Sequence, residues 1–231
     1  MKRFYETVAC EQMDDGWAVT LDGRAIKTPG KATLLMPTLK VAELAALEWD
    51  EQGDEVKPLE MPVTCLVNTA IDRVKDRMDE IADEVVAYGG NDLICYRADD
   101  PDDLVQRQCQ LWDPYVAWAG QTLNAPLKVT SGITHVSQEK SAMSALLVAV
   151  KAYDAHALTG LHALTTGLGS LVLALASQQR DQPFEDIWQA ALLEELYQVE
   201  HWGEDYEASD MRGNLRRDMA QTIAYMQALK A

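Results

Sequence analysis

Apolar and polar side chains alternate at short intervals near the start of the chain, up to residue 36. Turn-forming pairs interrupt this alternation at Asp15-Gly16, Asp22-Gly23 and Pro29-Gly30. The pattern predicts a small antiparallel sheet. We expect its strands at Phe4–Cys10, Trp17–Leu21, Arg24–Thr28 and Thr33–Met36. The packed face of this sheet is expected to hold Phe4, Val8, Trp17, Val19 and Leu21.

Helical spacing replaces the alternation after the predicted sheet. The first helix is expected at residues 38–52, because Thr38 is a suitable N-cap and Gly53 a suitable stop. Pro62 fits the first turn of a second helix, and a further helical pattern ends at Gly89-Gly90. The sheet is too small to be stable alone and is expected to pack against a helix, of which the helix at residues 38–52 is the first candidate.

The second half of the chain has a helical period almost throughout. We predict helices at Asp103–Leu123, Ser137–Ala152, Asp154–Gln178, Pro183–Trp202 and Glu207–Lys230, with an extended connector at Leu127–Val136. Gly160 and Gly167 leave room on the third of these helices for another helix to approach closely. The fold class is therefore predicted as α+β. A small N-terminal antiparallel β domain with packing helices (residues 1–100) is followed by a larger all-helical domain (residues 101–231).

Charge narrows the range of partners. The chain has 37 acidic and 20 basic residues, a formal net charge of −17. Such a surface repels phosphate backbones and anionic lipids, so we expect neither nucleic acid nor membrane as a partner. The first residues reach the acidic Glu6 before any apolar run, which predicts no signal or transit peptide and a cytoplasmic location.

Motifs for common chemistry are missing from the sequence. There is no GxxxxGK[ST] run for ATP, no CxxC pair, and no HExxH or HxxxH spacing for a metal. Gly167-Leu168-Gly169 begins like a dinucleotide fingerprint, but Val172 stands where the third glycine is needed. We therefore expect no cofactor, no metal and no catalytic residue.

An acidic segment rich in aromatic residues lies near the C-terminus, from Glu194 to Asp205. Helical spacing places Glu195, Gln198 and Trp202 on one stripe, with Glu194, Tyr197 and His201 beside it. Carboxylates next to large rings form a suitable recognition surface for a polypeptide, because charged hydrogen bonds are strong and aromatic rings anchor interfaces. The alternative is an ordinary helix with its rings in the core and its acids in water.

Two further polar clusters stand out. Glu200 and Glu204 are four residues apart and, with His201, could form an acid–base pair in a small-molecule enzyme. Asn68, Asp72 and Arg73 are expected to form a structural network that joins their helix to the sheet domain. Trp49, near the end of the first helix, is expected to have a structural role in pinning that helix to the sheet.

Eight unusual phrases occur in order along nearly the whole chain. They are GWAVTLDGRAIKTPG from Gly16, EWDEQG from Glu48, MPVTCLVNTAIDRV from Met61, DLICYRA from Asp92, RQCQLWDP from Arg107, GITHV from Gly132, GLGSLVLALA from Gly167 and EELYQVEHWGED from Glu194. With these phrases the chain resembles the ATP synthase assembly chaperones of the ATP-twelve type, which act on the alpha subunit of the catalytic head.

This resemblance implies a function and a binding site. The chain would be an ATP-independent, monomeric chaperone that binds the free ATP synthase alpha subunit and prevents its aggregation until it pairs with beta. The family's acidic-aromatic segment falls on Glu194, Glu195, Tyr197, Gln198 and Trp202, with Glu195 as the first candidate for the functional carboxylate. Without a transit peptide, a bacterial member is expected. The enzyme hypothesis and a generic holdase activity remain the alternatives.

Overall fold

The computed structural model describes residues 2–132, 134–180 and 182–230. Its strands are β1 (Val8–Met13), β2 (Gly16–Leu21), β3 (Arg24–Ala25), β4 (Leu35–Met36), β5 (Tyr96–Arg97) and β6 (Thr130–Ser131). Its α-helices are α1 (Leu39–Asp50), α2 (Pro62–Thr69), α3 (Met78–Gly90), α4 (Asp102–Thr122), α5 (Lys140–Lys151), α6 (Ala155–Leu168), α7 (Leu171–Gln179), α8 (Phe184–Ala191), α9 (Leu193–Trp202) and α10 (Tyr206–Ala228). Short 3-10 or π turns lie at Pro58–Glu60, Ala70–Val74 and Leu93–Cys95.

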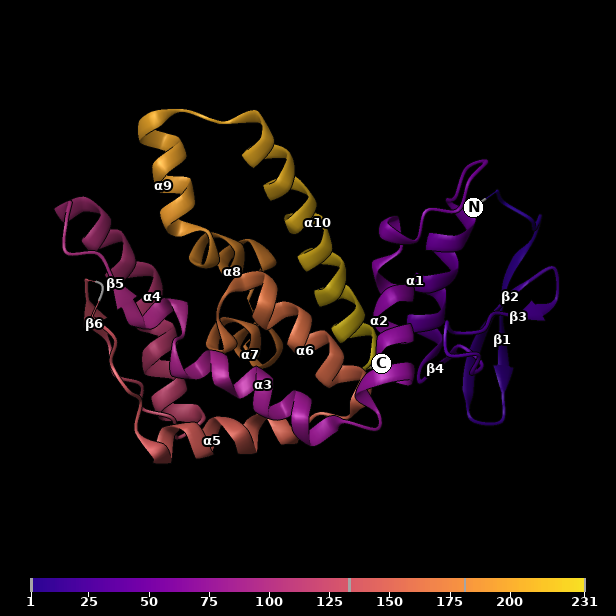
Figure 1. The fold of residues 1–231 in the computed structure, drawn as a ribbon, viewed down its shortest axis with the longest axis horizontal. Helices are drawn as coiled ribbons and strands as arrows, with labels where there is room; N and C mark the ends of the chain where they lie inside the picture. Colours follow the sequence, from indigo (N-terminus) through magenta and orange to yellow (C-terminus); the bar gives the residue numbers. More distant parts are fainter. Residues whose placement is uncertain (1, 133, 181, 231) are drawn as a thin grey trace. The chain divides into compact units, whose positions relative to one another are not determined.

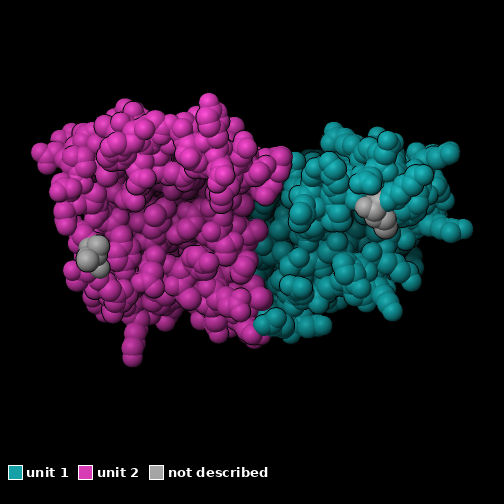
Figure 2. All heavy atoms as spheres, turned by 45° about the horizontal axis from the view of Figure 1, so that its top comes forward, with its two compact units in different colours: residues 1–78, 154–160, 221–231 teal, residues 79–153, 161–220 magenta. Residues whose placement is uncertain are grey.

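This order of elements confirms the α+β class: a small N-terminal antiparallel sheet precedes a larger helical region (Figure 1). The chain forms two compact units, coloured in Figure 2. Unit 1 contains residues 1–78, 154–160 and 221–231, and unit 2 contains residues 79–153 and 161–220. Helices α6 and α10 each contribute to both units. The predicted domains, residues 1–100 and 101–231, are a different division of the chain and stay a prediction.

The sheet of unit 1 is built around β2. β1 pairs antiparallel with the full length of β2, with Val8 opposite Leu21, and β3 and β4 pair with the end and the beginning of β2. The turn between β2 and β3 has positive φ at Asp22 (49°) and Gly23 (75°), the pattern of a type I′ hairpin turn. The Asp-Gly turn predicted from sequence is therefore confirmed.

The predicted packed face of the sheet is only partly correct. Val19 and Leu21 are buried, but Phe4 is 63% exposed and lies before β1, which begins at Val8 instead. Tyr5 takes the buried place, and its hydroxyl donates to the backbone oxygen of Trp49 at 2.6 Å. Because successive residues of an extended chain point to opposite sides, burying Tyr5 turns Phe4 outward.

Helix α1 packs against β1 and β2 and begins as predicted. The side chain of its N-cap, Thr38, accepts a hydrogen bond from the backbone N–H of Val41 at 3.2 Å. Near the other end of α1, the buried Glu48 carboxylate accepts hydrogen bonds from the backbone of Val63 at 2.7 Å and of Thr64 at 2.8 Å. Glu48 thereby caps the N-terminus of α2, where a helix favours negative charge. Burial raises the pKa of Glu48.

Two helices predicted as continuous are broken in the structure. The predicted helix Asp154–Gln178 is divided into α6 and α7 at Gly169, which has a φ of 67°. The next residue, Ser170, restarts the helix as an N-cap by accepting a hydrogen bond from Leu173 N at 3.0 Å. The predicted helix Pro183–Trp202 is divided into α8 and α9 at Leu192 (φ −100°, ψ 13°).

A fully buried carboxylate, Asp92, organises the start of α7 in unit 2. Asp92 accepts hydrogen bonds from the backbone N–H of Val172 at 3.0 Å and of Ile94 at 3.4 Å. Burial raises the pKa of Asp92 to about 6. Asp92 thus joins the Leu93–Cys95 turn to α7.

Gly160 and Gly167 allow the close approach that the sequence predicted. A side chain at Gly160 would collide with Met226, and one at Gly167 would collide with Met219. Both methionines belong to α10, which therefore lies against α6. The predicted connector Leu127–Val136 contains β6, which pairs parallel with β5, while Ile133 of this connector lies outside the described residues. No described helix is both long enough and apolar enough to cross a membrane.

Candidate interaction surface

The acidic-aromatic segment forms α9 and the turn that leads into α10, both in unit 2 (Figure 1). We call the part formed by Glu195, Gln198, Trp202, Glu204, Tyr206, Met211 and Arg212 the α9–α10 surface; the predicted Glu194 and Tyr197 lie beneath it. Helix α9 begins after the break at Leu192 and ends at Gly203, whose φ is 88°. The glycine turns the chain so that α10 can follow within three residues.

An arginine from α10 organises the carboxylates of this surface. Arg212 donates to Glu195 and to Glu204, each at 2.7 Å, and only 10% of its side chain is exposed. Arg212 uses Oε1 of Glu195, and among the described residues no group donates to the other oxygen, Oε2. Hydrogen bonds from Ser209 and Arg212 lower the pKa of Glu204. Glu195 is therefore ion-paired and oriented, with one oxygen left to accept a further hydrogen bond.

Glu194 contacts helix α4, whereas Glu195 contacts helix α10. The side-chain amide of Gln108, which is fully buried in α4, donates to Glu194 at 2.6 Å. Burial raises the pKa of Glu194, and the hydrogen bond from Gln108 lowers it in part. Glu194 thus connects α9 to α4 beneath the surface.

Tyr197 is buried, with 5% of its surface exposed. Its hydroxyl donates to the Asp103 carboxylate at 2.9 Å, and its ring stacks on His201 with 4.0 Å between the centroids. The guanidinium of Arg107 lies 5.3 Å from the centre of the same ring. Tyr197 therefore fixes α9 against α4, while the neighbouring Gln198 is exposed.

Large apolar side chains are exposed around the turn between α9 and α10. Trp202 is 76% exposed, Tyr206 90% and Met211 72%. Carboxylates of this segment, including Asp205 and Glu207, are exposed beside them in the sequence. Several exposed large apolar side chains within ten residues, with exposed carboxylates among them, favour a protein interaction site.

Sequence reasoning missed Tyr206, Met211 and Arg212 in this surface. Arg212 lies 17 residues from Glu195 and on another helix, so helical spacing does not pair them. Tyr206 and Met211 fall at the start of the last helix, and helical periodicity alone does not say which of its residues are left uncovered.

The acid–base pair suggested by Glu200 and Glu204 does not form. Glu200 is bound by Arg107, with contacts of 2.5 and 3.1 Å, whereas Glu204 is bound by Arg212. The hydrogen bond from Arg107 lowers the pKa of Glu200. An acid catalyst needs a raised pKa, so this cluster does not support the enzyme hypothesis. Among the described residues, no group of three or more His, Cys, Asp or Glu is placed to hold a metal ion.

The residues expected to have structural roles lie in unit 1. Trp49 is 9% exposed, and its ring centroid lies 5.7 Å from that of Tyr5. Asp72 accepts hydrogen bonds from the Thr28 hydroxyl and the Gly30 N–H, both at 2.7 Å, so it joins its helical turn to the loop after β3. The part-buried Asn68 has no partner for its side-chain oxygen among the described residues. Arg73 is exposed, and the described residues form no ion pair with it.

A sequence profile of the family described as ATP12 chaperone protein matches residues 2–120, more than half of the chain. The chain belongs to the ATP12 chaperone family. The resemblance noted from the sequence phrases is thereby confirmed.

Individual ATP12 proteins agree with this assignment. The structure of Atp12 from Paracoccus denitrificans matches with a TM-score of 0.91 and 36% identity, covering 99% of this chain and 98% of that one. A mutant form of the same Paracoccus protein also matches with a TM-score of 0.91 and 36% identity, over 99% and 97% of the two chains. Mitochondrial protein atp12 of Schizosaccharomyces pombe is 26% identical over 122 residues. That alignment spans 49% of this chain and 42% of the yeast protein.

Proposed function

We propose that this chain is an ATP synthase assembly chaperone that binds the free alpha subunit through the α9–α10 surface. Membership of the ATP12 chaperone family supports the general role. The observation that supports the site is the exposure of Trp202, Tyr206 and Met211 beside paired carboxylates. A subunit that has not yet met its neighbour exposes apolar surface and aggregates, and reversible coverage of that surface suppresses aggregation by mass action.

Within this surface the residues have different tasks. Trp202 supplies contact area, because most of its ring is uncovered. Glu195 offers Oε2 to an arginine or a backbone N–H of the alpha subunit, while Arg212 holds its Oε1. Gln198, one turn before Trp202, adds a polar contact. Glu194 and Tyr197 act indirectly, since their contacts with Gln108 and Asp103 hold α9 in position.

The proposed activity needs no chemical step and no ATP. Binding and release follow from competition, because the beta subunit covers the same face of alpha when the head assembles. We further propose that the chaperone acts as a monomer, so that one surface serves one alpha subunit. Light scattering of the purified chain tests this, and a mass of twice 25.7 kDa would contradict it.

The decisive experiment is co-purification with the ATP synthase alpha subunit from the same source, without beta, followed by addition of beta. We expect a stoichiometric complex that beta dissolves. No complex at micromolar concentrations would overturn the proposal. Equal protection of unrelated aggregating proteins would indicate a generic holdase instead.

Variants of Glu195 test the assignment of the site. Glu195→Gln and Glu195→Lys should both protect alpha less well than wild type, and the charge reversal should be the more severe. Glu185→Gln is a matched control, because Glu185 is also paired with an arginine, Arg216 at 2.6 Å, but lies in α8. If both Glu195 variants protect alpha as well as wild type, the assignment is wrong.

A further inference from the structure

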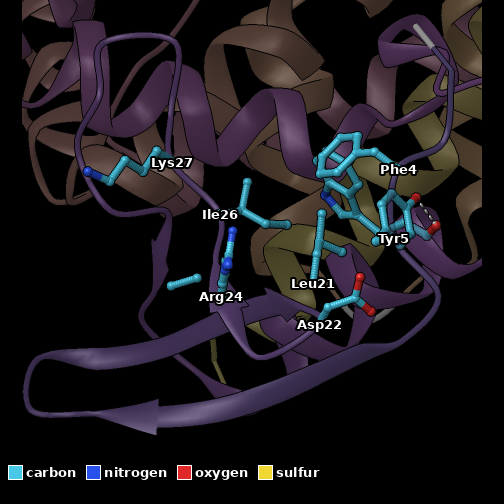
Figure 3. A pocket seen from close by; sticks show the side chains of 9 residues that line it. Phe4, Tyr5, Leu21, Asp22, Arg24, Ile26 and Lys27 are labelled. Carbon is cyan, nitrogen blue, oxygen red and sulfur yellow. Dashed lines mark hydrogen bonds between the residues drawn. The ribbon is translucent and has the colours of Figure 1, made fainter.

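Unit 1 contains a pocket of about 590 Å³ outside the surface described above. Figure 3 shows Phe4 and Tyr5 gathered at one end, Leu21 and Ile26 between them and the charged end, and Arg24 and Lys27 toward the other end. Trp49 also lines the pocket. Its volume is within the range of ligand sites, about 300–1,000 Å³. The pocket thus has aromatic and apolar side chains toward one end, with Asp22 beside Leu21, and the basic Arg24 and Lys27 toward the other.

Trp49, which lines this pocket, has a buried indole N–H that is not used as a donor. Trp49 is 9% exposed, and its Nε1 has no hydrogen-bond partner among the described residues. The neighbouring hydroxyl of Tyr5 is already used, since it donates to the backbone oxygen of Trp49. A buried donor left unpaired is costly, so a ligand that offers an acceptor here gains affinity. A backbone carbonyl of an extended chain is such an acceptor.

The three charged side chains that line the pocket differ in their contacts. Asp22 is held by its own chain, because its Oδ1 accepts hydrogen bonds from the backbone of Glu6 at 3.1 Å and of Thr7 at 2.9 Å. Arg24 and Lys27 are exposed, and the described residues form no ion pair with either of them. Hydrogen bonds from Thr7 and the charge of Arg24 lower the pKa of Asp22. Neither Arg24 nor Lys27 is ion-paired among the described residues, so both can meet the carboxylate of a ligand.

This basic end is unusual for so acidic a protein. Residues 1–31 contain five basic and five acidic side chains, so the net charge of −17 comes from the rest of the chain. An anionic ligand that is repelled by most of the protein meets Arg24 and Lys27 at this pocket.

We propose that the pocket binds an extended polypeptide segment in which a large apolar residue is followed by an acidic one. The apolar side chain packs against Phe4, Leu21 and Ile26, a backbone carbonyl accepts from the Trp49 indole, and the carboxylate meets Arg24 and Lys27. The identity of the polypeptide rests on the proposed function, which supplies an unassembled subunit as the client. Unit 1 then provides a second client contact whose charge is opposite to that of the α9–α10 surface.

The test follows the Trp49 indole N–H signal by NMR, identified by its loss in Trp49→Phe. The probes are the blocked peptide acetyl-Ala-Phe-Asp-Ala-amide and its counterpart with Asn in place of Asp. We expect the Asp peptide to shift the Trp49 signal saturably and to bind about fivefold more tightly than the Asn peptide, the size expected for an exposed charge contact. An unmoved Trp49 signal at millimolar peptide, or equal binding of both peptides, would overturn the proposal.

Charge variants separate this pocket from the α9–α10 surface. The double variant Arg24→Glu, Lys27→Glu should weaken the Asp peptide by about tenfold. The matched control is Lys2→Glu, Lys31→Glu, which makes the same change in net charge outside the pocket lining and should bind like wild type. Equal weakening in both variants would indicate a general charge effect and contradict the site.

The same variants distinguish failure of this inference from failure of the proposed function. If alpha binds wild type and the Arg24, Lys27 variant equally well, the client does not use the pocket and only this inference fails. If alpha does not bind wild type at all, the proposed function fails, and the peptide titration still decides whether the pocket binds an acidic segment.

Discussion

Helices α1 and α9 both contain carboxylates close to a tryptophan, but the two helices place them in opposite environments. In α1, Glu48 is buried and caps α2, and Trp49 is 9% exposed. In α9, Glu195 is paired with Arg212 at the surface, and Trp202 is 76% exposed. The ring of Trp49 and the carboxylate of Glu48 therefore stabilise the fold, whereas the ring of Trp202 is largely uncovered. The difference comes from what packs against each helix, not from its composition.

The largest expected effect separates the two tryptophans. Trp49→Ala should lower the free energy of unfolding by about 3–5 kcal/mol, because a large buried ring is lost from the core. Trp202→Ala should change it by no more than about 0.5 kcal/mol, because the ring is mostly in water. Urea unfolding followed by circular dichroism measures both. An unchanged stability of Trp49→Ala would refute its structural role.

The next effect concerns binding. Trp202→Ala should weaken the complex with the alpha subunit by about 2 kcal/mol or more, roughly 30-fold in Kd, as expected for a central aromatic anchor. Val148→Ala is a suitable control, since Val148 is 73% exposed on α5. Calorimetric titration gives both affinities. Equal affinities for Trp202→Ala and the control would remove Trp202 from the interface.

Replacing the buried carboxylate of α1 should have a smaller effect, on stability. Glu48→Gln leaves one acceptor oxygen where two are used by Val63 and Thr64, so we expect a loss of about 1–2 kcal/mol at neutral pH. Because burial raises the pKa of Glu48, the ionised form is disfavoured in the folded state. The contribution of Glu48 to stability is therefore greatest at a pH below the pKa that this side chain has in the unfolded chain. It declines as the pH rises through the higher pKa of Glu48 in the folded protein.

We would measure unfolding curves of wild type and Glu48→Gln at several pH values above about 4, the ordinary pKa of a glutamate side chain. The difference in stability between the two proteins should narrow as the pH rises. A difference that widens with rising pH would show that the ionised carboxylate is the favoured form in the folded protein.

The smallest expected effect lies in the ion pair between Glu195 of α9, whose side chain is 44% exposed, and Arg212 of α10. Glu195→Gln should lower stability by less than about 1 kcal/mol, because pairs with solvent access contribute little. A double-mutant cycle with Arg212→Gln measures the coupling between the two side chains. A coupling well above that size would indicate that Glu195 is part of the core network like Glu48, and that the contrast between the two helices is false.

Short sequence features predicted the fold correctly where the backbone conformation depends on neighbouring residues and not on tertiary contacts. Thr38 as a cap, Pro62 at the first turn of α2 and the Asp22-Gly23 turn follow from backbone chemistry and are confirmed. The breaks at Gly169 and Leu192 were missed, because an apolar run hides a change of direction that buried neighbours such as Asp92 impose. Hydrophobic periodicity reports burial but not where a buried helix ends.

The sequence indicated the segment that forms the candidate site but not the tertiary contacts of its side chains. Helical spacing placed Glu195 and Trp202 on one stripe, which agrees with their surface positions in α9. It could not indicate that Tyr197 is buried against Asp103, since that contact spans 94 residues. Side chains joined across such distances depend on the tertiary fold, and one sequence does not show them.

The three-segment composition of unit 1 has a consequence for synthesis on the ribosome. Unit 1 is completed only by residues 221–231. Within this segment, the hydroxyl of Tyr225 donates a hydrogen bond to the backbone oxygen of His156, and the backbone oxygen of Ala228 accepts one from the hydroxyl of Thr38. At about 5–20 residues per second, adding the chain after residue 78 takes roughly 8–30 s. During that time the emerging sheet lacks its final partner. During synthesis this assembly factor is therefore itself an incompletely folded polypeptide until its last segment is available.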